Sequence, residues 1–82
     1  MEKVYVYIKD VANDYDDDLF VELYASKNDA IAQLAKDRNE VIDYWKENGV
    51  IECDSETSFS ACEDGFHARN HDHFYIVERI IN

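Results

Sequence analysis

The cysteine and histidine residues are the side chains of this chain best suited to chemistry, and all five lie between Cys53 and His73. Thiolate and imidazole groups are the ligands that zinc prefers in proteins. Clustering of these residue types in so short a window predicts a structural zinc ion with tetrahedral coordination. The predicted ligands are Cys62, His67, His71 and His73.

The expected course of the chain decides which cysteine belongs to this set. If residues 57–62 and 73–80 form neighbouring antiparallel strands, Cys62 and His73 meet at the mouth of the loop that carries the other two histidines. Cys53 precedes Cys62 by nine residues, and an extended chain rises about 3.3 Å per residue, so Cys53 ranks as a fifth, more distant candidate. The spacing C-x4-H-x3-H-x-H matches no standard zinc finger, and the alternative is that the histidines hold no metal.

Catalytic interpretations of the same residues are weaker. Cys62 with His67 would supply a nucleophile and a base, and the histidines with Asp72 would suit a metal-dependent hydrolase. The run around Asn70 and His71 resembles His-Asn-His nucleases superficially, but those enzymes place the site on a ββα unit, and here a strand is expected to follow. The chain has two glycines and no Gly-rich phosphate loop. We therefore expect a protein that is not an enzyme.

The charge of the chain is extreme for its length. Nineteen Asp and Glu residues against eight Lys and Arg residues give 82 residues a formal net charge of −11. Such a field repels phosphates and anionic membranes, and it attracts basic surfaces. The charge predicts a basic protein partner, with no direct binding of nucleic acid or membrane; the alternative is that the acidic residues only keep the protein soluble.

The apolar pattern argues against export and membrane insertion. No apolar run is long enough to cross a bilayer, and no export signal opens the sequence. We expect a cytoplasmic protein, whose two cysteines are reduced thiols or metal ligands, with a Cys53–Cys62 disulfide as the alternative.

The first half of the chain predicts a β-hairpin followed by a helix. Residues 4–8 and 19–24 alternate as strands do, and the acidic segment 10–18 between them is expected to be an exposed loop. On the first strand Val4, Val6 and Ile8 share one side and Tyr5 and Tyr7 the other. On the second strand the side expected to face inward comprises Leu19, Val21 and Leu23.

The helix is expected over residues 27–48. Ser26 and Asp29 form a typical helix start, and Gly49 stands where a left-handed cap would end the run. Trp45 is the largest expected core residue of its apolar stripe. Arg38 interrupts this stripe and is expected at its edge.

Two further strands are expected over residues 57–62 and 74–81. The predicted fold is α+β with the order ββαββ: a single domain, residues 1–82, in which one long helix packs on one face of an antiparallel sheet. The other face is open, and we expect it to carry Tyr5, Tyr7 and several acidic residues.

Length, acidity, the absence of proline and the absence of catalytic motifs together resemble small acidic proteins of phages and mobile elements that inhibit bacterial defences, above all anti-CRISPR inhibitors of type II, single-effector nucleases. The resemblance implies binding to an RNA-guided nuclease and a block of target DNA loading or cleavage, with a zinc-binding member fitting the Cys and His set. Such nucleases hold nucleic acid in channels lined with Lys and Arg, which an acidic protein can occupy as a DNA mimic. The expected contact residues are Asp14, Asp16, Asp17, Asp18, Glu52, Asp54, Glu56, Glu63 and Asp64.

Two other functions remain open. A small regulatory or antitoxin-like protein would bind one host protein through an apolar patch and would be nearly insensitive to salt. A metal-dependent hydrolase would lose turnover when His67 or His71 is replaced.

Overall fold

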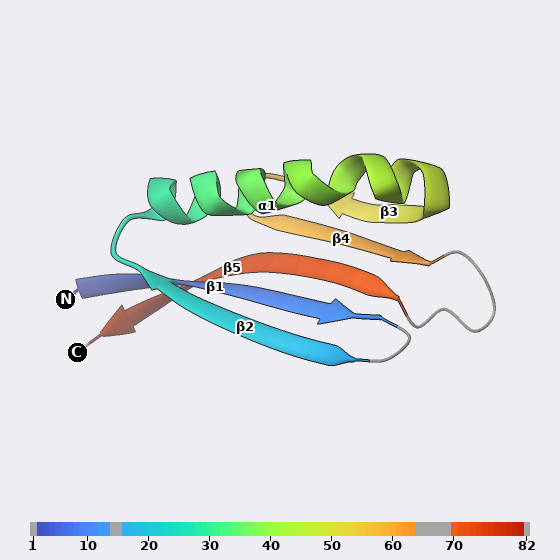
Figure 1. The fold of residues 1–82 in the computed structure, drawn as a ribbon. Helices are drawn as coiled ribbons and strands as arrows, with labels where there is room; N and C mark the ends of the chain where they lie inside the picture. The colour runs from blue at the N-terminus through green and yellow to red at the C-terminus, as the bar shows by residue number, and fades with distance from the viewer. Residues whose placement is uncertain (1, 14–15, 64–69, 82) are drawn as a thin grey trace.

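One helix packs against a five-stranded antiparallel sheet in the computed structural model, which describes residues 2–13, 16–63 and 70–81 (Figure 1). The predicted α+β class and the single long helix are confirmed. The elements in chain order are β1 (Glu2–Ala12), β2 (Asp17–Tyr24), α1 (Lys27–Asn48), β3 (Gly49–Asp54), β4 (Ser58–Glu63) and β5 (His71–Ile81).

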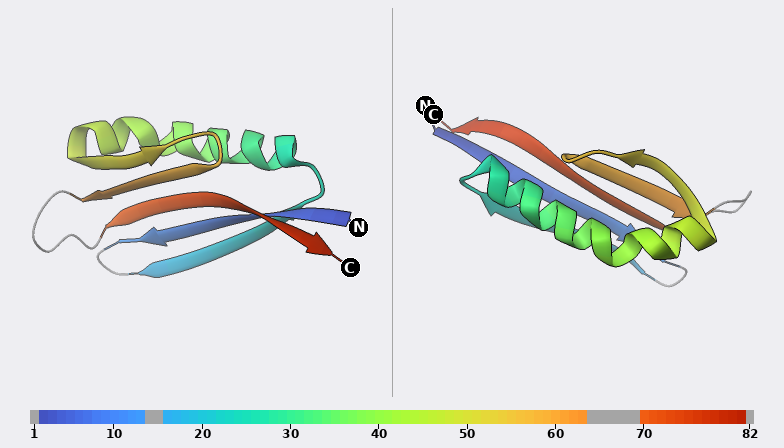
Figure 2. Two further views of the ribbon diagram at one scale, coloured as in Figure 1. Left: turned by 180° about the vertical axis from the view of Figure 1, so that it is seen from behind. Right: turned by 90° about the horizontal axis from the view of Figure 1, so that it is seen from above.

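The strands lie in the order β2-β1-β5-β4-β3, so the two longest strands, β1 and β5, occupy the middle of the sheet. All neighbouring pairs are antiparallel, and Val6 of β1 lies between Leu23 of β2 and Val77 of β5. The two chain termini lie side by side at one end of the molecule, and α1 runs along one side of the sheet (Figure 2). No helix in the described part of the chain is long and apolar enough to span a membrane.

The helix begins and ends where the sequence predicts. The Ser26 hydroxyl accepts a hydrogen bond from the Asp29 N–H, which satisfies one of the free donors of the first turn. At the other end the Gly49 N–H donates to the Trp45 carbonyl. The predicted left-handed cap is wrong, because the backbone of Gly49 is extended; a Cβ atom there would instead collide with the Trp45 ring and the Cys62 carbonyl. Gly49 is therefore required by close packing between helix and sheet.

Strand β3, which the sequence did not predict, follows α1 without a loop. The sequence predicts no strand here, because Val50 and Ile51 after the helix are followed at once by the polar run 52–56. In the structure Ile51 lies opposite Ala61 of β4, and the register then shifts by one residue at Glu52, so that Cys53 lies opposite Ser60. This bulge breaks the alternation by which a strand is recognised in a sequence.

The predicted orientation of the first hairpin is wrong. Tyr7 is fully buried under α1 with Phe59, Ala61 and Phe74, so it is not on the open face. Because neighbours along a strand point to opposite faces, Val6 and Ile8 and their β2 neighbours lie on the open face instead. The Tyr7 ring reaches the helix and its hydroxyl finds a buried acceptor there, which an aliphatic side chain cannot do.

Candidate functional site

One end of the molecule gathers the ends of four strands. Ala12 at the end of β1 lies opposite both Asp17 at the start of β2 and His71 at the start of β5, and His71 lies opposite Cys62 on β4. We call this the acidic end, because six described carboxylates lie on the strand residues and the turn that form it. They are Asp10, Asp16, Asp17, Asp18, Glu63 and Asp72.

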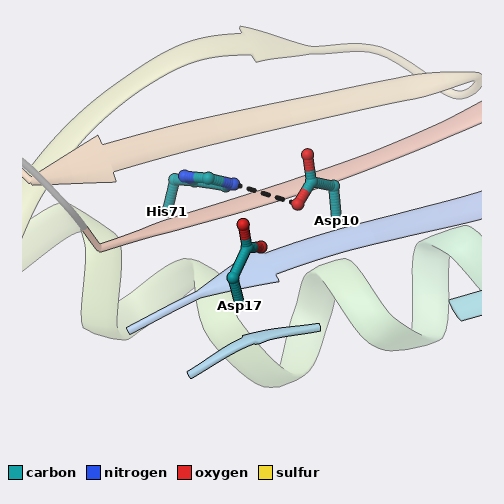
Figure 3. Close-up of side chains that lie close together, drawn as sticks. All are labelled: Asp10, Asp17 and His71. Atoms are coloured by element: carbon teal, nitrogen blue, oxygen red, sulfur yellow. Dashed lines mark hydrogen bonds and ion pairs between the residues drawn. The ribbon is translucent and has the colours of Figure 1, made fainter. Parts of the chain in front are cut away.

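Asp10, Asp17 and His71 come together on the open face of the acidic end (Figure 3). The His71 Nε2 atom lies 3.2 Å from an Asp10 carboxylate oxygen, and one ligand atom from each of the three residues lies within 4.8 Å of the others. The side chains of Asp10 and His71 are about two-fifths exposed. Two carboxylates and one imidazole can bind a divalent cation.

The predicted zinc ligands are partly brought together. Cys62 lies opposite His71, and His73 follows on the same face of β5, opposite Ser60. Among the described residues, however, the group with metal-binding separations contains His71 and neither Cys62 nor His73. The His73 ring packs on the Tyr75 ring, with centroids 4.7 Å apart. His67 lies outside the described residues, so the complete set stays a prediction.

The two cysteines are not joined by a disulfide, in contrast to the alternative drawn from the sequence. Cys53 lies on β3 opposite Ser60, and Cys62 lies on β4 opposite Val50. The Cys53 thiol contacts the Ser58 carbonyl at 3.7 Å. Cys53 thus lies on the edge strand, opposite a residue two positions further from the acidic end than Cys62.

The predicted partner-binding acids fall into two places. Asp16, Asp17 and Asp18 are exposed at the acidic end, and the half-buried Glu63 accepts a hydrogen bond from the Asn70 N–H there. Asp14 and Asp64 lie outside the described residues. The remaining three lie on β3 and in the turn that follows it, away from the acidic end, and they are Glu52, Asp54 and Glu56.

Asp54 is compensated by a basic neighbour. The Arg38 guanidinium donates two hydrogen bonds to its carboxylate, at 3.0 and 2.6 Å, and thereby holds the pKa of Asp54 below its usual range. The same bonds raise the pKa of Arg38. A carboxylate held in this way adds less to the outward negative field than the exposed acids of the β1–β2 hairpin do.

Two acids that the sequence prediction did not rank as contact residues fix the helix to the sheet. The Trp45 indole N–H donates a hydrogen bond of 2.8 Å to Asp72, and Asp37, on the buried side of α1, accepts one from the Tyr7 hydroxyl of β1. Asp37 sits three residues after Leu34 on the apolar stripe, which was the available signal in the sequence. Asp10 is a third acid that the sequence prediction did not rank as a contact residue. It belongs to the acidic end only because β1 continues to Ala12.

Comparison of the chain with protein-family models, with curated proteins and with solved structures finds no match. The resemblance to anti-CRISPR inhibitors therefore stays a prediction.

Proposed function

We propose that this protein binds a basic surface of a protein partner through its acidic end. The observation that carries the proposal is the placement of Asp16, Asp17 and Asp18 as consecutive exposed residues where β2 begins, beside Asp10. Asp16, Asp17 and Asp18 have no Lys or Arg ion pair among the described residues, and an exposed cluster of like charges is a strong source of electrostatic attraction for a cationic surface.

The distribution of ion pairs supports this choice of surface. The Lys and Arg pairs of the described residues join Lys3 to Glu78, Lys9 to Asp37 and Arg38 to Asp54. None of these pairs includes an acid of the β1–β2 hairpin. The three paired cations thus neutralise carboxylates elsewhere, and the acids of the hairpin have no Lys or Arg pair among the described residues.

The partner class follows from the resemblance given by the sequence. An RNA-guided nuclease of the single-effector CRISPR class presents Lys and Arg side chains along its nucleic-acid channel. Occupation of that channel by the acidic end would exclude target DNA and so prevent loading or cleavage. This inhibitor would act in the cytoplasm of the host cell, where the nuclease works.

The test compares two triple variants that change the net charge equally. Asp16→Asn, Asp17→Asn and Asp18→Asn together remove three adjacent hairpin charges, and Glu2→Gln, Glu40→Gln and Asp43→Asn remove three exposed charges elsewhere that are not among the expected contact residues. Cleavage of a target DNA by a guide-loaded single-effector nuclease is measured against inhibitor concentration. We expect the first variant to need at least about tenfold more protein for half inhibition, and the control to stay within about twofold of the unchanged chain.

Two results would contradict the proposal at different levels. Equal losses in the two triple variants would show that net charge acts without the acidic end. Full cleavage in the presence of saturating unchanged protein, across nucleases of this class, would exclude the proposed partner.

A further inference from the structure

Strand β2 is an edge strand with apolar side chains exposed on both faces. It occupies one end of the strand order, and in Figure 1 it lies at the side of the sheet farthest from α1. Leu19, Val21 and Leu23 on the open face are 65%, 56% and 68% exposed, and Phe20 on the helix face is 50% exposed. A strand exposed in this way leaves apolar surface in water that a second layer or a further strand would remove.

The two edges of the sheet differ in how they are protected. Edge strands usually carry bulges, charges or short lengths that discourage pairing with another chain. Both edge strands carry acidic residues, but β3 has six residues and a bulge at Glu52, whereas β2 has eight residues in unbroken register with β1. The backbone N–H and C=O groups on the outer side of β2 have no strand partner among the described residues. The edge at β2 is therefore the one suited to pairing.

We propose that β2 pairs antiparallel with β2 of a second copy of this chain, about a two-fold axis at Val21, and joins the two sheets into one. A two-fold axis perpendicular to the sheet keeps both helices on the same face. Because side chains along a strand alternate between the two faces, residues that lie opposite each other must then differ by an even number in the sequence. Centred on Val21, the pairing places Leu19 opposite Leu23 of the other copy and Val21 opposite its counterpart. The exposed aliphatic row then continues across the interface.

The charges along β2 select this register. With Val21 at the centre, Asp17 lies opposite Ala25, and Asp18 opposite Tyr24, so no acid faces an acid. A shift of the centre to Phe20 would place Asp18 opposite Glu22, which is unfavourable because like charges directly opposite one another repel. A shift to Glu22 would oppose that residue to its own copy.

Antiparallel pairing also separates the most strongly charged parts of the two copies. Because the acidic end lies where β2 begins, the acidic ends of the two copies fall at opposite ends of the joined sheet. Lys9, whose ammonium lies 5.6 Å from the centre of the Phe20 ring, stays on the helix face, toward which Glu22 of the other copy would point. The remaining repulsion between two chains of net charge −11 is long-ranged and screened by salt.

Sedimentation equilibrium tests the dimer directly, from low micromolar to several hundred micromolar protein. We expect reversible dimerisation that strengthens as salt rises, the opposite of the salt dependence proposed for the basic partner, so the two proposals fail independently. Val21→Lys should weaken the dimer at least about tenfold, and Val50→Lys, the matched change on the other edge strand, should leave it unchanged. A monomer at every concentration, or a dimer that survives Val21→Lys, would overturn the proposal.

Cysteine cross-linking tests the register, in a chain whose two cysteines are replaced by serine. Val21→Cys should form a disulfide with its own counterpart, because directly opposed residues have Cα atoms within the range that a disulfide spans. Leu19→Cys should not cross-link to itself, since the two copies of this residue lie about 13 Å apart along the strand, but should cross-link to Leu23→Cys when the two proteins are mixed. Self-cross-linking of Leu19→Cys, or its absence in Val21→Cys, would refute this pairing.

Discussion

The hydroxyl of Tyr7 donates a hydrogen bond of 2.7 Å to Asp37, and this bond joins the middle of the sheet to the buried side of α1. The same carboxylate accepts a bond of 3.2 Å from the Gln33 amide and lies 3.5 Å from the Lys9 ammonium. A buried carboxylate is tolerated only when its oxygens are paired in this way. The network explains why tyrosine, and not valine or isoleucine, faces the helix on β1.

Replacement of Tyr7 by phenylalanine should destabilise the fold while keeping its shape. The ring remains, but one oxygen of Asp37 loses its donor, which costs about 1–3 kcal/mol of unfolding free energy for a buried polar group. Urea denaturation measures the loss. Tyr5→Phe is the matched control, since Tyr5 is only half-buried, and equal losses in the two variants would contradict the role assigned to the bond.

Tyrosine titration should extend well above the ordinary range. Burial, followed by the hydrogen bond to Asp37, raises the pKa of Tyr7, and the hydrogen bond to Glu22 raises the pKa of Tyr24 to about 12. Raised pKa values mean that the fold favours the protonated phenols. Their contribution to stability is complete below pH 10 and is lost as pH rises from there toward and beyond 12.

Ultraviolet absorbance of tyrosinate against pH checks this order of titration. We expect the unchanged protein to show a late phase that is smaller in Tyr7→Phe. Complete ionisation of all six tyrosines near pH 10, while circular dichroism still reports a folded chain, would contradict it.

The Arg38–Asp54 pair should contribute modestly and only above acid pH. The lowered pKa of Asp54 means that the fold favours its ionised form, so the contribution is present above the ordinary carboxyl range and is lost as pH falls through the lowered pKa. Arg38→Gln should reduce stability by at most about 1 kcal/mol at pH 7, because both side chains are partly exposed. The difference should vanish at strongly acid pH. An Arg38→Gln defect that persists at low pH, or matches that of the exposed control Lys36→Gln, would exclude the ion pair as its cause.

The zinc prediction gives a stoichiometry and an assignment of ligands. Protein prepared without a histidine tag should contain about one zinc ion per chain by elemental analysis, and a chelator should lower its melting temperature. Cys62→Ser should lose the metal, and Asp17→Asn should retain it.

The reverse pattern of metal retention would assign a divalent cation to Asp10, Asp17 and His71 and contradict the Cys and His set. A metal-free protein whose melting temperature does not change when the chelator is added would contradict both assignments.

Local signals in the sequence were sufficient for the helix and four of the strands. Ser26 marks the start of α1 through a hydrogen bond to Asp29, three residues away, and Gly49 marks its end, although the packing that requires glycine there also involves Cys62 of β4. β3 was missed because its bulge at Glu52 removes the period of two. A strand of this kind is defined by its neighbour β4 more than by its own residues.

The face of β1 could not be predicted from alternation alone. Its two sides are both apolar, with Val and Ile against Tyr, and the choice depends on Asp37, thirty residues further along the chain. The same holds for the Asp10, Asp17 and His71 group, because its members come from three strands and meet only through the register of β1 with β2 and β5. The exposed acids of the hairpin, in contrast, follow from composition and were predicted.

Salt dependence of partner association tests the central claim about the acidic end most directly. The association rate constant of the protein with a guide-loaded single-effector nuclease is measured between about 50 mM and 500 mM salt, for the unchanged chain and for the variant without charges at Asp16, Asp17 and Asp18. We expect the rate constant of the unchanged chain to fall steeply with salt, and that of the variant to be lower and much less sensitive. Identical rate constants and identical salt dependence for the two proteins would contradict the claim.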